Sequence, residues 1–192
     1  MELDEISTTA RRVAAAFDMS PPQVEAGRTA RWSPTGVSLR ERGGSLVLII
    51  GPQFHTLQSA DADAALAEIC AGYKIHPRTF RRLGLAFLAL LAFLVIAMSL
   101  ANFQTDVPGW GNVLGVGLLL VGWLLILVPW LRWFTYQIDR EIFEALGWPV
   151  VHAALDFDRR NPLKVPLRWL TPGVATRRNR LATRHQFQPP VP

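Results

Sequence analysis

Cysteine and histidine are scarce in this chain of 192 residues, and their scarcity limits the chemistry that the sequence supports. The single cysteine, Cys70, has no partner for an internal disulfide, so we do not expect the fold to depend on oxidation. The four histidines lie far apart, at positions 55, 76, 152 and 185, and Cys70 and His76 are not at a standard ligand spacing. We therefore expect no metal site and no cofactor.

Catalytic and nucleotide-binding motifs are also missing. The chain has no G-x-S-x-G nucleophile motif, no G-x-x-x-x-G-K-[ST] phosphate loop and no G-x-G-x-x-G dinucleotide fingerprint. The opening segment MELDEIST is acidic and polar, so it lacks the apolar core of a signal peptide. We therefore predict no catalytic residue from motifs and expect no cleaved leader.

Charged residues are absent from two long apolar runs, residues 83–101 and 113–131, each 19 residues long. A helix of this length measures about 28 Å, close to the roughly 30 Å of a hydrocarbon core. The connection at residues 102–112 contains Pro108 and two glycines and predicts a turn. We therefore predict a transmembrane helical hairpin; the alternative is a pair of buried helices in a soluble bundle.

The charges around these runs predict an orientation. Arg78, Arg81 and Arg82 precede the first run and Arg132 follows the second, whereas the connection carries only Asp106. Basic flanks mark the cytoplasmic side of a membrane. The abundance of Ala, Arg and Trp and the shortage of Lys suggest a high-GC bacterium. We therefore predict a location in a bacterial inner (cytoplasmic) membrane, with both termini cytoplasmic.

The segment before the first run predicts both helix and strand. Apolar residues at helical spacing indicate a helix over residues 3–18. Apolar and polar residues alternate before Gly43-Gly44, and an apolar run follows these glycines, which predicts a β-hairpin over residues 37–50 with an extended segment before it. Ser59 is the expected N-cap of an amphipathic helix over residues 61–73. The fold class is therefore α+β.

The segment after the second run predicts further helices. An amphipathic helix over residues 132–146 is broken by Gly147 and Pro149, and a short helix over residues 150–158 follows. The predicted organisation is a cytoplasmic N-terminal part at residues 1–82, the hairpin at 83–131, cytoplasmic helices at 132–158 and a basic, proline-containing tail at 159–192.

The C-terminal tail is strongly basic, since no acidic residue follows Asp158. Near a bilayer, each basic residue adds about 1 kcal/mol of attraction to anionic headgroups. Lipid is therefore a better candidate than nucleic acid, and the alternative is a solvated tail that follows the positive-inside rule. The residues predicted to bind lipid or a partner are Arg159, Arg160, Lys164, Arg168, Arg177, Arg178 and Arg180.

Three glycines of the second run, Gly115, Gly117 and Gly122, indicate a helix face that another membrane protein approaches closely. The alternative is that they are ordinary glycines of a membrane helix.

The order of these elements resembles that of the HtpX-type membrane zinc metallopeptidases, gluzincins related to the CAAX prenyl proteases. Three stretches carry the resemblance, SADADAALAEICAGYKIHPRTFRR, TYQIDREIFEALG and TPGVATRRNRL. It extends over about residues 4–181. The resemblance implies an α+β membrane protein, in which a two-span helical hairpin carries a cytoplasmic metallopeptidase-like domain of helices and a β-hairpin.

The zinc helix of that family has the motif His-Glu-x-x-His, in which the histidines bind zinc and the glutamate is the general base. In one alignment of this chain the ligand positions hold Glu68 and Gly72, and the base position holds Ile69. With Glu68 as the base instead, the ligand positions hold Ala67 and Ala71. Neither alignment leaves two nitrogen ligands.

The other family positions are also altered. The third ligand stands four residues before an aspartate that orients a ligand histidine; here the ligand position holds Thr135 and the aspartate is Asp139. The family's Thr-His-Pro is Thr171-Pro172-Gly173. Because a catalytic zinc needs three protein ligands, the resemblance implies a degenerate member without metal. Without a histidine to orient, Asp139 is expected to be a surface or salt-bridged carboxylate, and Glu68 a solvated one.

The leading hypothesis is a non-catalytic, membrane-anchored pseudopeptidase that acts as an interaction or accessory subunit of a membrane protein complex. Its expected partners are other integral membrane proteins or anionic lipid headgroups, without nucleic acid, small-molecule substrate or cofactor. The alternatives are a residual membrane metallohydrolase and an orphan two-span protein with a lipid-binding basic tail. The family hypothesis also predicts that the helices over 61–73 and 132–146 pack together.

Overall fold

The computed structural model describes residues 2–29, 35–104, 110–162 and 169–186. The chain divides into two compact units. The sheet unit comprises Met1–Ile75 and Thr135–Pro192, and the two-helix unit comprises His76–Phe134. Two long helices contribute residues to both units.

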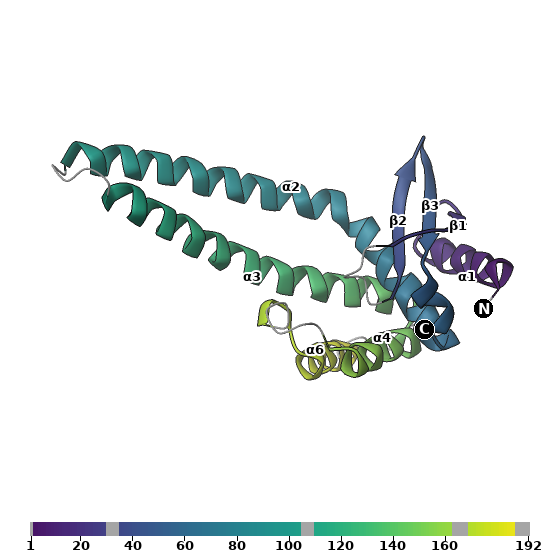
Figure 1. The fold of residues 1–192 in the computed structure, drawn as a ribbon. Helices are drawn as coiled ribbons and strands as arrows, with labels where there is room; N and C mark the ends of the chain where they lie inside the picture. The colour runs from purple at the N-terminus through teal and green to yellow at the C-terminus, as the bar shows by residue number, and fades with distance from the viewer. Residues whose placement is uncertain (1, 30–34, 105–109, 163–168, 187–192) are drawn as a thin grey trace. The chain divides into compact units, whose positions relative to one another are not determined.

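A three-stranded sheet forms one side of the sheet unit (Figure 1). Its strands are β1 (Gln23–Ala26), β2 (Val37–Arg42) and β3 (Ser45–Ile50), in the order β1-β3-β2. β2 and β3 are antiparallel, and Gly43 and Gly44 turn between them with φ angles of +58° and +79°. Because L side chains rarely adopt such angles, the glycine pair determines the turn and the predicted β-hairpin is confirmed. β1 was expected only as extended chain, and it pairs with β3 in parallel.

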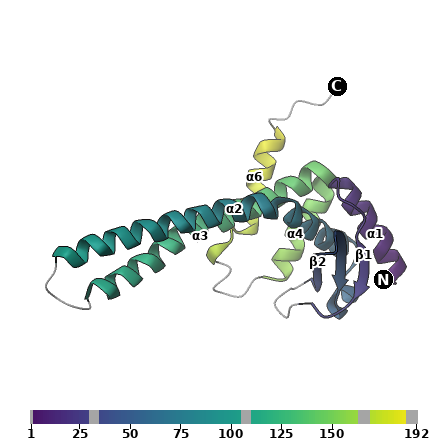
Figure 2. The same cartoon turned by 90° about the horizontal axis from the view of Figure 1, so that it is seen from above.

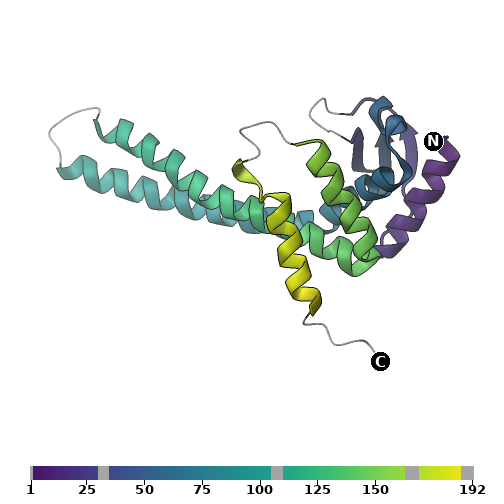
Figure 3. The same ribbon diagram turned by 90° about the horizontal axis from the view of Figure 1, so that it is seen from below.

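The rest of the sheet unit is mainly helical. The sheet unit contains α1 (Leu3–Ala16), the 3-10 helix η1 (Pro52–Thr56), the first part of α2 (Ser59–Gln104), the last part of α3 (Trp110–Leu146), α4 (Trp148–Arg160) and α6 (Val174–Gln186). α1 confirms the predicted N-terminal helix, and Gly147, with φ of +79°, separates α3 from α4 as predicted. α6 lies within the segment predicted as a basic tail, and it packs beside α4 (Figures 1 and 3).

One apolar core joins these elements. Its fully buried side chains include Phe17 directly after α1, Ile50 of β3, Leu66 of α2, Ile142 of α3 and Leu155 of α4. Cys70 and Ala71 of α2 belong to the same core, and burial raises the pKa of the Cys70 thiol to about 11. Within the sheet unit, α2 and α3 therefore pack into a common core, and Lys74 Nζ of α2 lies 3.3 Å from Glu141 Oε2 of α3.

The two-helix unit consists of the rest of α2 and α3, which run antiparallel side by side (Figures 1 and 2). Aromatic pairs join them: the ring centroids of Phe80 and Trp130 are 5.4 Å apart, and those of Phe87 and Trp123 are 4.9 Å apart. The two apolar runs are thus helical and paired. Much of the predicted turn at residues 102–112 lies outside the described residues.

The prediction of two transmembrane helices is wrong. Among the residues that the structure describes, no helix combines the length and the apolar character needed to cross a membrane. Each apolar run is the interior of a longer helix that continues without a break into a charged segment, through Arg81 in α2 and Arg132 in α3. This finding overturns the two-span fold class, the membrane anchor and the predicted inner-membrane location, and leaves an α+β fold.

Candidate functional site

A pocket of about 520 Å³ lies within the sheet unit, where α2, α3, α4 and the start of α6 meet. α2 contributes Glu68 and α3 contributes Thr135 and Ile138, while the remaining wall comes from α4 and the chain around the beginning of α6. Those remaining lining residues are Asp158, Arg159, Asn161, Pro162, Thr171, Pro172, Gly173, Val174 and Arg177.

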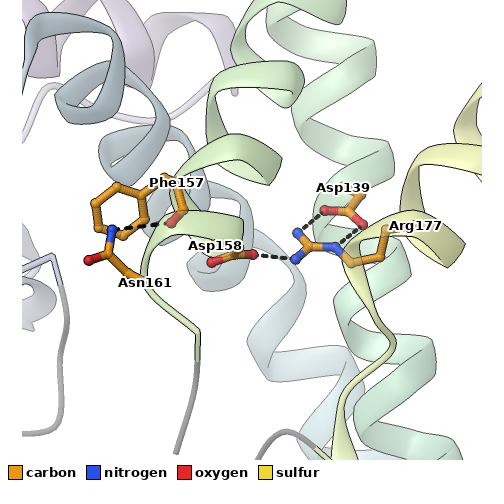
Figure 4. Close-up of polar contacts among 5 residues, drawn as sticks. All are labelled: Asp139, Phe157, Asp158, Asn161 and Arg177. Carbon is orange, nitrogen blue, oxygen red and sulfur yellow. Dashed lines mark hydrogen bonds and ion pairs between the residues drawn. The ribbon is translucent and has the colours of Figure 1, made fainter.

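Beside the pocket, three charged side chains form a cluster (Figure 4), in which Arg177 and Asp158 line the pocket and Asp139 is buried behind them. The Nε and Nη2 atoms of Arg177 donate hydrogen bonds to the two carboxylate oxygens of Asp139, at 2.8 and 2.5 Å. The Nη1 atom of Arg177 donates to Asp158. Asp139 is 1% exposed and Arg177 is 6% exposed. These contacts attach α6 to both α3 and α4.

The carboxylates around Arg177 stabilise its positive charge. Burial by itself lowers the pKa of Arg177, but the hydrogen bonds and charges of Asp139 and Asp158 outweigh burial, so the pKa is raised. A guanidinium that pairs with a carboxylate in this two-pronged geometry is strongly oriented. Arg177 therefore stays charged and orients the first turn of α6, where its N–H binds the carbonyl of Gly173 at 3.1 Å.

Glu68 differs from Arg177, because its carboxyl group has no such partner. It is partly buried at the pocket wall, and within the described chain no hydrogen bond or ion pair joins it to another residue. Burial raises the pKa of Glu68 to about 8, the nearby charges of Asp158 and Asp139 add to this rise, and Arg177 opposes it. Glu68 is therefore mostly protonated at neutral pH, whereas the sequence predicted a solvated carboxylate.

The structure brings several positions of the expected degenerate site together. Glu68 and Thr135 line the same pocket, and Asp139 adjoins it through Arg177. Ile69 is instead partly buried against the apolar core, and a Cβ atom added at Gly72 would lie 4.0 Å from Ile138 of α3. The altered Thr-His-Pro segment, residues 171–173, lines the pocket as well.

Arg177 is the site residue whose role the sequence did not reveal. It was predicted to bind lipid or a partner, whereas the structure buries its side chain between two carboxylates of the same chain. A signal was present in α3, where Asp139 lies between the apolar residues Ile138 and Ile142 and so required a buried cation. The sequence offered no way to choose Arg177 among the many arginines of the tail.

The other basic residues of the expected lipid- or partner-binding set are mostly engaged within the chain. Arg160 forms an ion pair with Asp61 of α2 at 2.6 Å, and Arg178 contacts His152. The guanidinium of Arg180 lies 4.1 Å from the centre of the Tyr136 ring. Arg159 is exposed and lines the pocket. Lys164 and Arg168 lie outside the described residues, and whether this segment binds lipid or a partner stays a prediction.

The three glycines of the second run differ in their surroundings. A Cβ atom added at Gly122 would lie 3.1 Å from Leu90, so this glycine permits close packing inside the two-helix unit. A Cβ added at Gly117 would meet nothing within 4 Å. The surroundings of Gly115 are not among those described. The close contact at Gly122 is therefore one within the chain, and a contact of these glycines with another protein stays a prediction.

The described residues hold no group of three His, Cys, Asp or Glu side chains placed to bind a metal ion. No protein family model matches the chain, and no curated protein or solved structure matches it either. The interpretation of the pocket therefore depends on the residues that line it.

Proposed function

We propose that this chain is a non-catalytic binding protein, a pseudopeptidase that acts as an interaction or accessory subunit of a protein complex. The pocket is the observation that supports this proposal. Glu68, Thr135 and residues 171–173, the positions where the resemblance puts a peptidase site, surround one cavity of about 520 Å³. Cavities of this size are typical of binding sites.

The chemistry of the lining supports binding rather than hydrolysis. A catalytic zinc needs three protein ligands and an open position for water. At the expected ligand positions the pocket offers the carboxyl group of Glu68 and the hydroxyl group of Thr135, with Pro172 where the family has a histidine. Such a site can hold and orient a bound segment, but its groups do not form a recognised hydrolytic set.

The proposed ligand is a short segment of another polypeptide. Ile138, Pro162, Pro172 and Val174 provide apolar wall for a side chain. Polar groups next to them, among them the Glu68 carboxyl, can bind the more polar parts of the same segment. A site that has lost the ligands for catalysis but kept its cavity would bind peptides without cleaving them.

A pocket-filling variant tests this proposal. A Cβ atom added at Gly173 meets nothing within 4 Å, so Gly173→Phe places a large side chain at the pocket wall without a clash at its Cβ. A displayed peptide library would be selected on the wild-type protein, and the enriched peptides measured by fluorescence anisotropy. We expect Gly173→Phe to weaken their binding by about tenfold or more.

Gly84→Phe is the matched control, because a Cβ at Gly84 also meets nothing within 4 Å but lies in the two-helix unit. It should bind the selected peptides as the wild type does. Equal binding by all three proteins, or failure of the library to yield any binder, would contradict the proposal.

A hydrolase remains the rival, and the raised pKa of Glu68 is the observation that favours it, because groups that titrate near pH 8 often transfer protons. Casein and the selected peptides would be incubated with the protein, with and without zinc and a chelator. We expect no cleavage above the level of a Glu68→Gln variant. Stoichiometric zinc together with chelator-sensitive cleavage would establish the rival.

A further inference from the structure

We propose that the pocket binds a basic side chain, lysine or arginine, of the partner polypeptide, with Glu68 as its counter-charge. This inference rests on the proposed function, since it names the group by which the bound segment is recognised. It depends on the balance of charges around the cavity and on the shape of the lining.

The charges in the pocket wall and directly behind it are unequal in number. Glu68 on α2 and Asp158 on α4 line the pocket, and the buried Asp139 on α3 lies behind Arg177, whereas the guanidinium groups are those of Arg177 on α6 and Arg159 on α4. When all are ionised, three negative charges face two positive charges. The described site is therefore one cation short of neutrality.

The hydrogen bonds indicate which carboxyl group a further cation would pair with. Arg177 already binds Asp139 through Nε and Nη2 and Asp158 through Nη1, so its guanidinium is committed to those two carboxylates. Glu68 is the carboxyl group without a comparable partner in the described chain. An ammonium or guanidinium group entering the pocket would pair with Glu68, whereas an acidic ligand would meet the carboxyl groups of Glu68 and Asp158.

The protonation state of Glu68 is consistent with this assignment. Burial and the charges of Asp158 and Asp139 raise its pKa to about 8, which means that a proton now neutralises the group. A basic side chain would take the place of that proton, and the carboxyl group would ionise as the ligand binds. Binding and proton release are then linked, so affinity should rise with pH until about pH 8.

The apolar part of the lining fits the stem of the same ligand. Lysine and arginine carry several methylene groups between the backbone and the charged end, and these pack well on apolar surface. Ile138, Pro162, Pro172 and Val174 supply such surface beside Glu68. The pocket thus combines a wall for the stem with a carboxyl group for the charged end.

Two probes that differ only in the terminal ammonium group of the side chain test the inference. N-acetyl-lysine N-methylamide and N-acetyl-norleucine N-methylamide would be titrated into the ¹⁵N-labelled full-length protein and followed by NMR. We expect the lysine probe to bind about tenfold or more tightly than the norleucine probe. Its affinity should increase between pH 6 and pH 8, in the range where Glu68, with a pKa of about 8, loses its proton. Equal binding of the two probes, or affinity that does not change with pH, would overturn the inference.

Glu68→Gln should abolish the preference for lysine, leaving the two probes with equal affinity. The variant is expected to fold, because glutamine resembles the protonated glutamic acid that the pocket already holds. Glu144→Gln is the control, since Glu144 pairs with Arg140 on α3 and does not line the pocket. A lysine preference that survives in Glu68→Gln would overturn the assignment of Glu68.

The peptide selection separates this inference from the proposed function. Selected peptides that contain no lysine or arginine, but whose binding is lost in Gly173→Phe, would overturn the ligand class and leave the binding function in place. A selection with no pocket-dependent peptide would contradict the binding function itself.

Discussion

At the scale of single residues, Glu68 and Arg177 show two ways in which a helix can place an ionisable group in the interior. Arg177 remains charged because two carboxylates receive its hydrogen bonds. Glu68 lacks a cation and is neutralised by a proton instead, as its pKa of about 8 indicates. Both solutions follow from the cost of burying a charge, which is large unless the charge is paired or removed.

The protonation of Glu68 predicts a pH-dependent stability difference. Its pKa is raised from 4.5 to about 8 on folding, so between these values the folded state binds more protons than the unfolded state, and stability falls as pH rises. Glu68→Gln removes this effect. We expect the variant to match the wild type near pH 4.5 and to be more stable by a few kcal/mol, in order of magnitude, near pH 9. Urea unfolding at both pH values measures this, and a difference that is independent of pH would contradict it.

The Arg177 cluster predicts a large loss of stability when the guanidinium is removed. Arg177→Met leaves Asp139 buried without a cation, and breaking a buried pair from one side costs about 3–5 kcal/mol. Arg178→Met, on the same helix but exposed, should cost much less. The double variant Arg177→Met/Asp139→Asn should recover part of the loss, since the buried Asp139 position then carries no unpaired charge. Chemical unfolding of these proteins and of the single variant Asp139→Asn checks this, and additive effects of the two single changes would contradict direct coupling.

Asp139 shows how far the sequence could predict the site. The sequence left it as a surface or a salt-bridged carboxylate, and the structure shows the salt-bridged one. The partner could not be identified, because Asp139 and Arg177 are 38 residues apart and several other arginines were equally suitable. Glu68 was misjudged for a related reason, since its burial depends on α4 and on the start of α6, neither of which is near it in the sequence.

At the scale of elements, those specified by local interactions were predictable. α1 follows from the spacing of its apolar residues, and the β2–β3 hairpin follows from two adjacent glycines with positive φ. β1 has only four residues and pairs in parallel with a strand that is not its neighbour in the sequence. α6 is rich in arginine, and Arg177 is one of the residues that attach it to α3 and α4. These two elements require long-range contacts that no local pattern encodes.

Gly122 predicts a packing effect between α2 and α3 in the two-helix unit. Gly122→Leu places its Cβ 3.1 Å from Leu90, whereas Gly117→Leu on the same helix meets nothing within 4 Å at its Cβ. Both changes increase helix propensity by about 1 kcal/mol, so their difference isolates the contact with Leu90. We expect Gly122→Leu to be less stable than Gly117→Leu by roughly 1 kcal/mol or more, as is typical of overpacking. Thermal unfolding measures the difference, and equal midpoints would contradict close packing at Gly122.

At the scale of the whole molecule, the two apolar runs led to the wrong fold class. Their length and lack of charge were correct observations, and both runs are helical in the structure. A run of apolar residues predicts a helix whose apolar surface must be buried, but it does not specify what buries that surface. In the two-helix unit the runs cover part of each other, through pairs such as Phe87 with Trp123.

The division into two units predicts that the sheet unit folds without the two-helix unit. Its core draws on α1, the sheet, α4 and the parts of α2 and α3 nearest to them, and every member of that buried cluster lies within Met1–Ile75 or Thr135–Pro192. A chain in which a flexible Gly-Ser linker of about ten residues replaces residues 76–134 keeps all of these side chains. We expect it to unfold cooperatively and to retain the lysine preference of the pocket, because all the described lining residues are also present. Circular dichroism during heating and the two-probe titration measure these properties. A chain without a cooperative transition would show that the sheet unit depends on the helices that were removed.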